Sequence, residues 1–291
     1  MKLALNGSVM EASEAVISVY DHGFLYGIGL FETFRTYGGI PYLLDRHLKR
    51  LLEGCGQLGI PYEADQKRLA ASIRELLSVN GLDDGYVRLT VSAGEAELGL
   101  PAGDYDRPSE LLLVKPLPPP PPAGGKELRL LRTRRNTPEG HVRFKSLHYM
   151  NNIIAKRELL ASGASAGAEG LMLSRDGDWV AEGIVSNLFF AEGGVVHTPS
   201  VATGILPGIT RARVLELARE AGYETREGLY GWNRLLEADE IWLTNSIQEL
   251  VPVKALTDEE GRTRPVGRAE PGAIAMRLLS IYKETTIIGR M

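Results

Sequence analysis

The stretch RFKSLHYMNN, residues 143–152, places a lysine among apolar neighbours. Lys145 is flanked in sequence by Val142, Phe144, Leu147, Tyr149 and Met150. Such a setting disfavours the charged ammonium and favours the neutral amine, which is the nucleophilic form. For any single lysine, a surface position with the charged end in water is the commoner arrangement. Lys145 is therefore a candidate amine nucleophile that needs support from other motifs.

Two further stretches predict a phosphate-binding cup. In GILPGITRARVLELA, residues 204–218, Gly208 leads into a helix that starts with Ile209 and Thr210. The unpaired N–H groups of a helix start suit an anion, although a helix entry by itself is usually only structural. A second turn, Thr244-Asn245-Ser246, directly follows the predicted strand DEIWL and offers backbone N–H groups and a hydroxyl. Together the two turns favour phosphate binding.

Composition and charge exclude several classes of protein. The 291 residues carry 33 Lys and Arg against 37 Asp and Glu, so a nucleic acid is not expected as the main partner. The single cysteine, Cys55, excludes an internal disulfide and a multi-cysteine metal site, and we expect it in the core. No apolar run has the length of a signal peptide or a membrane span. We expect a cytoplasmic protein that does not bind membranes.

Three other patterns do not support the chemistry with which they are often associated. The five histidines are scattered, without a pair on one helix, so no metal site is expected. The sequence GASAG, residues 163–167, matches a nucleophile elbow, but a helix precedes it where that motif needs a strand, so we interpret it as a turn. Gly27-Ile28-Gly29 lacks the third glycine of a dinucleotide fingerprint, because Glu32 stands there. These glycines indicate instead that the backbone approaches a neighbouring chain or a ligand closely.

The proline-rich stretch KPLPPPPPAGG, residues 115–125, predicts an interdomain linker, with a rigid surface loop as the alternative. We expect a small α+β N-terminal domain at 1–117, a linker at 118–126 and a larger C-terminal domain at 127–291. Apolar spacing predicts helices at 44–58 and 66–79, and strands at 86–94 and 109–115. After the linker it predicts helices at 150–161 and 210–221 and strands at 127–133, 169–175, 186–192 and 239–245. These irregularly spaced strands suggest a mixed or barrel-like sheet.

Several ordered blocks resemble those of the fold-type IV pyridoxal-phosphate enzymes, a family that includes the D-amino-acid and branched-chain aminotransferases and 4-amino-4-deoxychorismate lyase. The blocks are YDHGFLYGIGLFETFR (20–35), DRHLKRL (45–51), RFKSLHYMNN (143–152), AEGIVSNLFF (181–190), GILPGITR (204–211) and ADEIWLTNSIQEL (238–250). The resemblance covers nearly the whole chain. It implies a two-domain α+β fold with pyridoxal 5'-phosphate in the larger domain, and a homodimer with active sites near the subunit interface.

The resemblance also implies roles for individual residues. Lys145 matches the catalytic lysine that carries the cofactor, Glu182 matches the carboxylate paired with the ring nitrogen, and Tyr149 matches a tyrosine at the phenolate oxygen. Leu206 matches the side chain packed on the ring face. The other matched positions are phosphate ligands at Arg50, Ile209, Thr210 and Ser246, and substrate contacts at Tyr26, Arg35, Arg88 and Ile247.

Within the family the chain resembles the bacterial 4-amino-4-deoxychorismate lyases in DHGFLYGIG, RRNTPEG, the HY-x-NN after the lysine, and TNS. This implies a small-molecule lyase that releases 4-aminobenzoate and pyruvate for folate synthesis. Transamination is the alternative, because it uses the same residues around the cofactor. The loop SAGEAELGL (92–100) lacks the arginine of D-amino-acid transaminases, whereas Tyr86-Val87-Arg88 resembles the branched-chain pattern. A non-enzymatic relative would have lost Lys145, Glu182 or Arg50, and all three are present.

Overall fold

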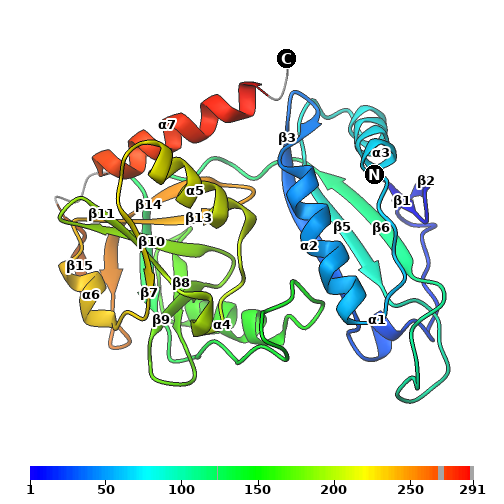
Figure 1. Cartoon of the computed structure of the whole chain (residues 1–291), viewed down its shortest axis with the longest axis horizontal. Helices are drawn as coiled ribbons and strands as arrows, with labels where there is room; N and C mark the ends of the chain where they lie inside the picture. The colour runs from blue at the N-terminus through cyan, green and yellow to red at the C-terminus, as the bar shows by residue number, and fades with distance from the viewer. Residues whose placement is uncertain (123, 268–271, 289–291) are drawn as a thin grey trace. The chain divides into compact units, whose positions relative to one another are not determined.

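The computed structural model describes residues 1–122, 124–267 and 272–288. The chain packs as two compact units, each of which has its own sheet (Figure 1). The described residues of the first unit are 1–118, the short segment Phe144–His148 and 286–288. Those of the second are 119–122, 124–143, 149–267 and 272–285.

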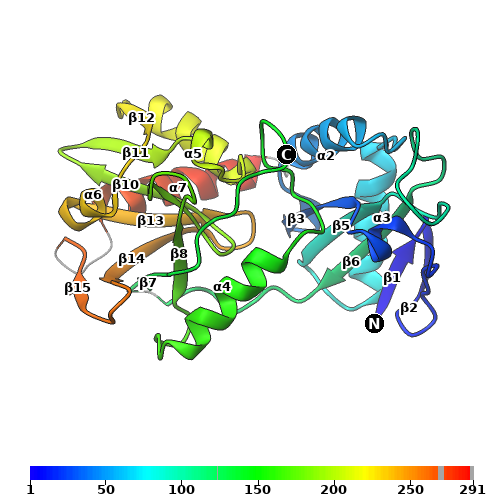
Figure 2. The same cartoon turned by 90° about the horizontal axis from the view of Figure 1, so that it is seen from below.

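An antiparallel sheet of six strands forms the first unit, in the order β2-β1-β6-β5-β3-β4. The strands are β1 (Lys2–Leu5), β2 (Ser8–Glu11), β3 (Gly29–Tyr37), β4 (Ile40–Pro41), β5 (Tyr86–Ser92) and β6 (Ser109–Lys115). The helices are α1 (His22–Leu25), α2 (Leu44–Gln57) and α3 (Gln66–Val79). The core of this unit lies between α2, α3 and one face of the sheet (Figure 2).

Strict alternation along the central strands produces this layered arrangement. In β5, Val87, Leu89 and Val91 are fully buried, whereas the residues between them are only partly buried. Successive side chains of a strand point to opposite faces, so one face of the sheet packs on the helices and the other carries polar groups. In β3 the second face carries Phe31, Thr33 and Arg35. This polar face becomes important for the candidate site.

The second unit has a nine-stranded mixed sheet, in the order β12-β11-β10-β13-β14-β7-β8-β9 with β15 paired to β14. Three of its pairs, β11 with β12, β14 with β7 and β7 with β8, are parallel. The first strands are β7 (Lys126–Leu130), β8 (Glu169–Leu173), β9 (Val180–Gly183), β10 (Asn187–Glu192) and β11 (Val195–Pro199). They are followed by β12 (Thr225–Gly228), β13 (Glu240–Asn245), β14 (Glu249–Thr257) and β15 (Thr263–Pro265). The helices are α4 (Met150–Ala161), η1 (Val201–Thr203), α5 (Ile209–Glu220), α6 (Trp232–Glu237) and α7 (Ala273–Ile288).

The predicted α+β fold with a barrel-like mixed sheet in its second part is confirmed, and so are the predicted helices and strands. Strands β5, β7 and β8 end two or three residues before the predicted ends. Beyond them the chain continues in irregular contact, as when Arg135 N donates to Leu173 O at 2.8 Å. The GASAG stretch forms the turn between α4 and β8, and Cys55 is buried.

The domain division at 1–117, 118–126 and 127–291 stays a prediction. One short segment from beyond the predicted linker packs with the N-terminal part of the chain. Residues Phe144–His148, which contain the candidate lysine, pack within the first unit, although they lie beyond the proline-rich stretch in sequence.

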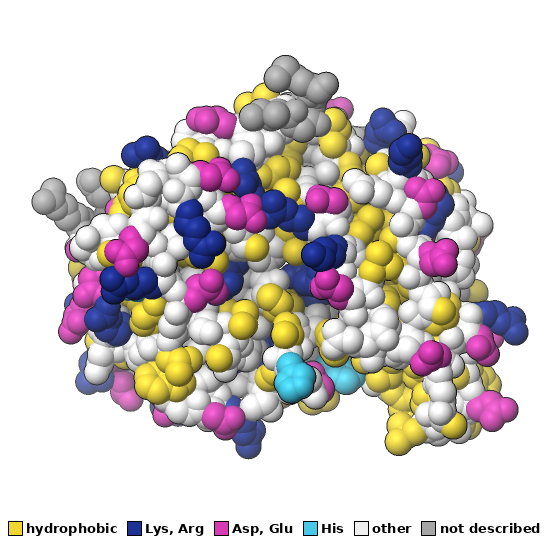
Figure 3. All heavy atoms as spheres, in the orientation of Figure 1, with side chains coloured by type: hydrophobic (Ala, Val, Ile, Leu, Met, Phe, Trp, Pro, Cys, Tyr) yellow, Lys and Arg dark blue, Asp and Glu magenta, His cyan; other side chains and the backbone are white. Residues whose placement is uncertain are grey.

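Charged side chains of both signs are interspersed over the face of the molecule drawn in Figure 3. This agrees with a near balance of acidic and basic residues along the chain. Among the residues that the structure describes, every helix is too short or too polar to span a bilayer.

Candidate active site

Lys145 lies against β3 in the first unit. The backbone of its segment runs antiparallel to this strand, because Phe31 N donates to Lys145 O at 2.9 Å and Leu147 N donates to Gly29 O at 3.0 Å. The Lys145 Nζ atom lies 4.7 Å from the centre of the Phe31 ring. The lysine is thus held on the polar face of the sheet by backbone pairing and by an aromatic contact.

The glycines of the GIG motif allow this pairing. A Cβ atom at Gly29 would lie 2.8 Å from Leu147 Cδ1, and one at Gly27 would lie 2.6 Å from the His148 ring. Gly27 also has a φ of +73°, a conformation that residues with a side chain rarely adopt. The close approach that the structure shows at these glycines is to the chain's own lysine segment, whereas the sequence had suggested a neighbouring chain or a ligand.

Two arginines lie on the same face of the sheet as Lys145. The Arg88 guanidinium lies 3.6 Å from the centre of the Phe31 ring, and Arg35 lies 4.5 Å from the centre of the Tyr37 ring. In the β3–β5 register Thr33 is opposite Arg88. The Thr33 hydroxyl is buried and has no hydrogen-bond partner among the described residues. This face can bind an anionic substrate beside the lysine.

The opposite face of β3 carries a buried charged cluster formed by Glu32, His47 and Arg50. Arg50 Nε and NH2 donate to the two Glu32 oxygens at 2.7 and 2.6 Å, and His47 Nδ1 lies 2.6 Å from Glu32 Oε2. Burial would raise the pKa of Glu32, but Arg50 and His47 outweigh it and hold the pKa at about 2. Burial lowers the pKa of His47 despite the neighbouring carboxylate. The cluster therefore contains one anion, one cation and a neutral imidazole.

The predicted substrate residue Tyr26 lies in a loop arrangement that His22 stabilises. The buried His22 ring contacts Tyr105 OH at 3.1 Å through Nδ1 and Glu97 O at 2.9 Å through Nε2. Tyr26 OH accepts a hydrogen bond from Gly99 N at 3.0 Å. These contacts fix the loop at 92–108 against α1.

In the second unit Glu182 is the centre of a buried polar network. Arg135 Nε donates to Glu182 Oε1 at 2.7 Å, while Asn187 Nδ2 and Leu206 N donate to Oε2 at 3.2 and 3.1 Å. A carboxylate has about four acceptor positions, of which these bonds use three. One position remains for a further donor such as a protonated ring nitrogen.

The two predicted phosphate turns meet in this unit. Thr210, in the first turn of α5, and Ser246, after β13, have their hydroxyl oxygens 3.1 Å apart. Asn245 Oδ1 accepts from Ile247 N at 3.0 Å and from Gln248 N at 2.8 Å, which fixes the second turn. The hydroxyls and the start of the helix form a small group of donors suited to an anion.

Asn187 connects this helix start to the Glu182 network. Its Nδ2 also donates to Leu206 O at 2.9 Å, and a Cβ atom at Gly208 would overlap its Oδ1 atom. Gly208 is the N-cap residue of α5. Because Gly208 has no side chain, Asn187 can lie against the start of α5 while it donates to Glu182 and to Leu206 O.

Arg143 fixes the neighbouring loops. Its guanidinium donates to Gly204 O at 2.5 Å and also to Asn136 O. Burial and the nearby Arg135 charge lower the pKa of Arg143 to about 10, so it remains a cation at neutral pH. Arg143 therefore anchors the beginning of the segment that carries Leu206.

Comparison with known proteins identifies the enzyme family of this chain. The Amino-transferase class IV family model matches residues 29–256. The aminodeoxychorismate lyase of Bacillus subtilis is 46% identical over 85% of this chain and 84% of its own.

The chain belongs to the class IV aminotransferase family.

Solved structures of this family agree in fold. The 4-amino-4-deoxychorismate lyase from Pseudomonas aeruginosa has a TM-score of 0.81 at 31% identity, covering 97% of this chain and 98% of its own. The branched-chain amino acid aminotransferase from Escherichia coli has a TM-score of 0.85 at 25% identity, covering 97% and 93%. A second branched-chain amino acid aminotransferase, from T.th. and complexed with N-(5'-phosphopyridoxyl)-L-glutamate, has a TM-score of 0.85 at 28% identity, covering 98% and 93%. The chain therefore has the fold-type IV architecture of both a lyase and an aminotransferase.

The predicted site residues of this class IV chain divide between the two units. Lys145, Arg50, Tyr26, Arg35 and Arg88 lie in the first unit. The second unit contains Tyr149, Glu182, Leu206, Ile209, Thr210, Ser246 and Ile247. The structure brings together Lys145 and Arg88 at Phe31, Glu182 and Leu206, and Thr210 and Ser246.

Sequence reasoning missed several residues of these networks, namely Glu32, Arg135, Arg143 and Asn187. The sequence does mark three of them. Glu32 lies inside an apolar strand, Arg135 lies within the RRNTPEG stretch, and Arg143 follows that stretch. A charged residue within an apolar run indicates a buried partner, which the sequence does not identify.

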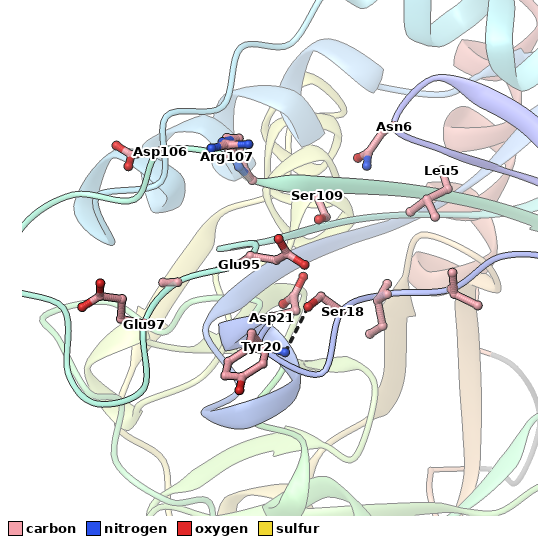
Figure 4. Close-up of a pocket in the computed structure, with 14 residues that line it drawn as sticks. Leu5, Asn6, Ser18, Tyr20, Asp21, Glu95, Glu97, Asp106, Arg107 and Ser109 are labelled. Carbon is pink, nitrogen blue, oxygen red and sulfur yellow. Dashed lines mark hydrogen bonds between the residues drawn. The ribbon is translucent and has the colours of Figure 1, made fainter.

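A groove of about 720 Å³ in the first unit lies away from these predicted residues. Figure 4 shows Asp21, Glu95 and Ser18 lining it, with Tyr20 beside them. Asp21 is engaged by Gly23 N at 2.7 Å and by the Ser92 hydroxyl at 2.7 Å. Asp21 in this groove therefore serves to hold α1 in place.

Proposed function

We propose that the protein is a pyridoxal 5'-phosphate enzyme in which Lys145 carries the cofactor. The remaining acceptor position of Glu182 supports this, since a protonated ring nitrogen needs such a partner. The hydroxyls of Thr210 and Ser246 at the start of α5 support a phosphate site. The phosphopyridoxyl group in the second aminotransferase complex has the same parts, a ring nitrogen and a phosphate.

The reaction we propose is the lyase reaction on 4-amino-4-deoxychorismate, which releases 4-aminobenzoate and pyruvate. The observation that carries this choice is the 46% identity to an aminodeoxychorismate lyase over 85% of the chain. The polar face of the first unit supports it, because the substrate carries two carboxylates and this face carries Arg35 and Arg88, of which Arg88 contacts the same Phe31 ring as Lys145.

In this reaction Lys145 acts as the general base. Its neutral amine removes the proton from the ring carbon that bears the substrate's amino group. The electron pair of that C–H bond completes the aromatic ring as the C–O bond to the enolpyruvyl group breaks with its electron pair on oxygen, and the released enolate takes up one proton on its methylene carbon to become pyruvate. The bound cofactor supplies an electron sink for the carbon that loses its proton. Glu182 would pair with the protonated ring nitrogen, and Arg135 holds the Glu182 carboxylate in place.

Transamination is a second candidate, which Tyr86 and Arg88 favour because their spacing resembles the branched-chain pattern. A product assay distinguishes the lyase reaction from transamination. Purified holoenzyme is given 4-amino-4-deoxychorismate, and separately branched-chain and D-amino acids with 2-oxoglutarate, and the products are resolved by chromatography. The proposal predicts 4-aminobenzoate with pyruvate. Glutamate formed without any 4-aminobenzoate would identify an aminotransferase instead.

We also propose a cytoplasmic homodimer with active sites near the subunit interface. The exposed apolar side chains of α4 support a second copy as the partner, since an exposed apolar patch marks an interaction site. Met150, Ile153 and Ile154 are at least half exposed on this helix. Light scattering should give a mass twice the 31.8 kDa of one chain. A monomer mass at all concentrations used in the assay would contradict the dimer.

A further inference from the structure

Glu32 is the most deeply buried acid in the first unit, at 1% exposure. Its two oxygens accept from Arg50 Nε and NH2 at 2.7 and 2.6 Å. Arg50 in turn is a predicted phosphate ligand, and its side chain keeps 16% exposure. A carboxylate that occupies two donors of a phosphate-binding arginine could compete with the phosphate for the guanidinium group.

The geometry decides against competition. A guanidinium has five N–H donors in a planar fork, and Glu32 takes the edge formed by Nε and NH2. The NH1 donors lie outside this two-bond contact, at the other edge of the fork. Because two parallel hydrogen bonds fix the plane of the fork, the direction of the NH1 donors is set before any anion arrives.

Charge explains why the arrangement is stable without phosphate. The pKa of Glu32 is held at about 2, so the carboxylate is ionised at neutral pH and compensates the charge of Arg50. An ionised carboxylate only accepts hydrogen bonds, so His47 donates to it from Nδ1 at 2.6 Å. His47 fixes one Glu32 oxygen from α2, the helix that also carries Arg50.

The position of Glu32 along β3 connects this cluster to the lysine. The residue before it, Phe31, bonds through its backbone N to Lys145 O at 2.9 Å and lies under Lys145 Nζ. Successive side chains of β3 point to opposite faces. β3 therefore pairs with the lysine segment along its edge, carries the Lys145 side chain over one face at Phe31, and binds Arg50 on the other face through Glu32.

We propose that Glu32 is a positioning residue that orients Arg50 for the phosphate of the cofactor, and so selects the phosphorylated cofactor over its dephosphorylated form. The inference rests on the proposed pyridoxal 5'-phosphate function and on Arg50 as a phosphate ligand. Glu32 itself touches only Arg50 and His47 among these groups, and its effect passes through Arg50.

The test compares dissociation constants for pyridoxal 5'-phosphate and for pyridoxal, which lacks the phosphate, with full-length protein freed of cofactor. Glu32→Gln should weaken binding of pyridoxal 5'-phosphate by about tenfold or more and change that of pyridoxal by less than about twofold. Glu32→Asp keeps the charge but shortens the side chain, so it should give a smaller loss in the same direction. A purely structural role would weaken both ligands alike.

The chain offers a matched control in the same unit. Glu110 also receives a two-bond arginine contact, from Arg68 at 2.9 and 2.6 Å, and contacts Tyr62 OH. Glu110→Gln removes a comparable ion pair and should leave the ratio of the two dissociation constants unchanged. Equal losses for both ligands in the two Glu32 variants, or tighter phosphate binding in Glu32→Gln, would overturn the inference.

The variant Arg50→Gln separates this inference from the proposed function. It should lose the same selectivity for the phosphorylated ligand. If Arg50→Gln loses selectivity and Glu32→Gln does not, the positioning role is wrong while Arg50 remains a phosphate ligand. If wild-type protein itself binds neither ligand, the proposed cofactor is wrong and the inference falls with it.

Discussion

At the scale of single residues, buried charges gain their roles from their partners. Glu182 and Glu169 are both buried acids on neighbouring strands of the second unit. Glu182 faces a cation, Arg135, whereas Glu169 accepts backbone bonds from Ile184 N at 3.0 Å and Gly170 N at 3.3 Å, and burial raises its pKa. Of these two acids, Glu182 is the one that accepts a hydrogen bond from an arginine, which is the setting expected for a carboxylate opposite a ring nitrogen.

This difference gives a prediction for Glu182→Gln. The amide has nearly the same shape but no charge, so the variant should still bind cofactor while its turnover falls by about 100-fold. Cofactor content and steady-state rates of product formation measure the two effects. Glu169→Gln is the control, and it should retain turnover. Unchanged turnover in Glu182→Gln would show that this carboxylate does not act on the ring nitrogen.

The low pKa of Glu32 predicts a pH dependence of stability. Its folded-state pKa of about 2 lies below the ordinary value of 4.5, so the ionised form stabilises the folded state. This contribution is fully present above about pH 4.5 and is lost as the pH falls towards 2. Urea unfolding of wild type and Glu32→Gln at several pH values should show a stability difference that narrows on acidification. A difference that stays constant across this window would contradict the assigned pKa.

At the scale of elements, the site depends on where helices and strands begin. The helix α5 starts at Gly208, where Asn187 approaches so closely that a Cβ atom would overlap it. Asn187 also bonds to Glu182 and to Leu206. The start of this helix and the Glu182 network are therefore coupled through one side chain.

We predict that Gly208→Ala weakens cofactor binding by about tenfold, because Asn187 must move and lose at least one hydrogen bond. A cofactor titration and a thermal unfolding curve measure the outcome. Gly231→Ala is a matched control, since Gly231 is the N-cap of α6 and a Cβ atom there meets no described atom within 4 Å. Equal effects of both substitutions would mean that the loss comes from the N-cap itself.

The elements also show what sequence could predict. Helices α2 and α3 were predicted nearly to the residue, because their apolar side chains recur at helical spacing. Local sequence also singled out Lys145, from its apolar neighbours, and the two turns as candidate phosphate sites. The pairing of the lysine segment with β3 could not be predicted, because it joins Leu30 to Ser146 across more than a hundred residues. Glu32 and Asn187 were missed for the same reason, since their partners come from distant segments.

At the scale of the whole molecule, each unit contributes a different part of the proposed chemistry. The first unit carries the lysine and the arginines of the polar face, and the second carries the Glu182 network and the start of α5. The family resemblance assigned both sets of residues to one site before the structure was known, because the family's motifs occur in the same order along the chain. Composition and periodicity alone predicted a two-part α+β protein without a reaction.

We propose above all that this class IV chain is a lyase that uses Lys145 as its base. The most direct measurement incubates a small amount of holoenzyme with excess 4-amino-4-deoxychorismate and no keto acid, and quantifies 4-aminobenzoate and pyruvate over time. We expect many turnovers with equal amounts of the two products, and none with Lys145→Ala. Product formation that stops after one equivalent per active site, or that requires a keto acid, would contradict it.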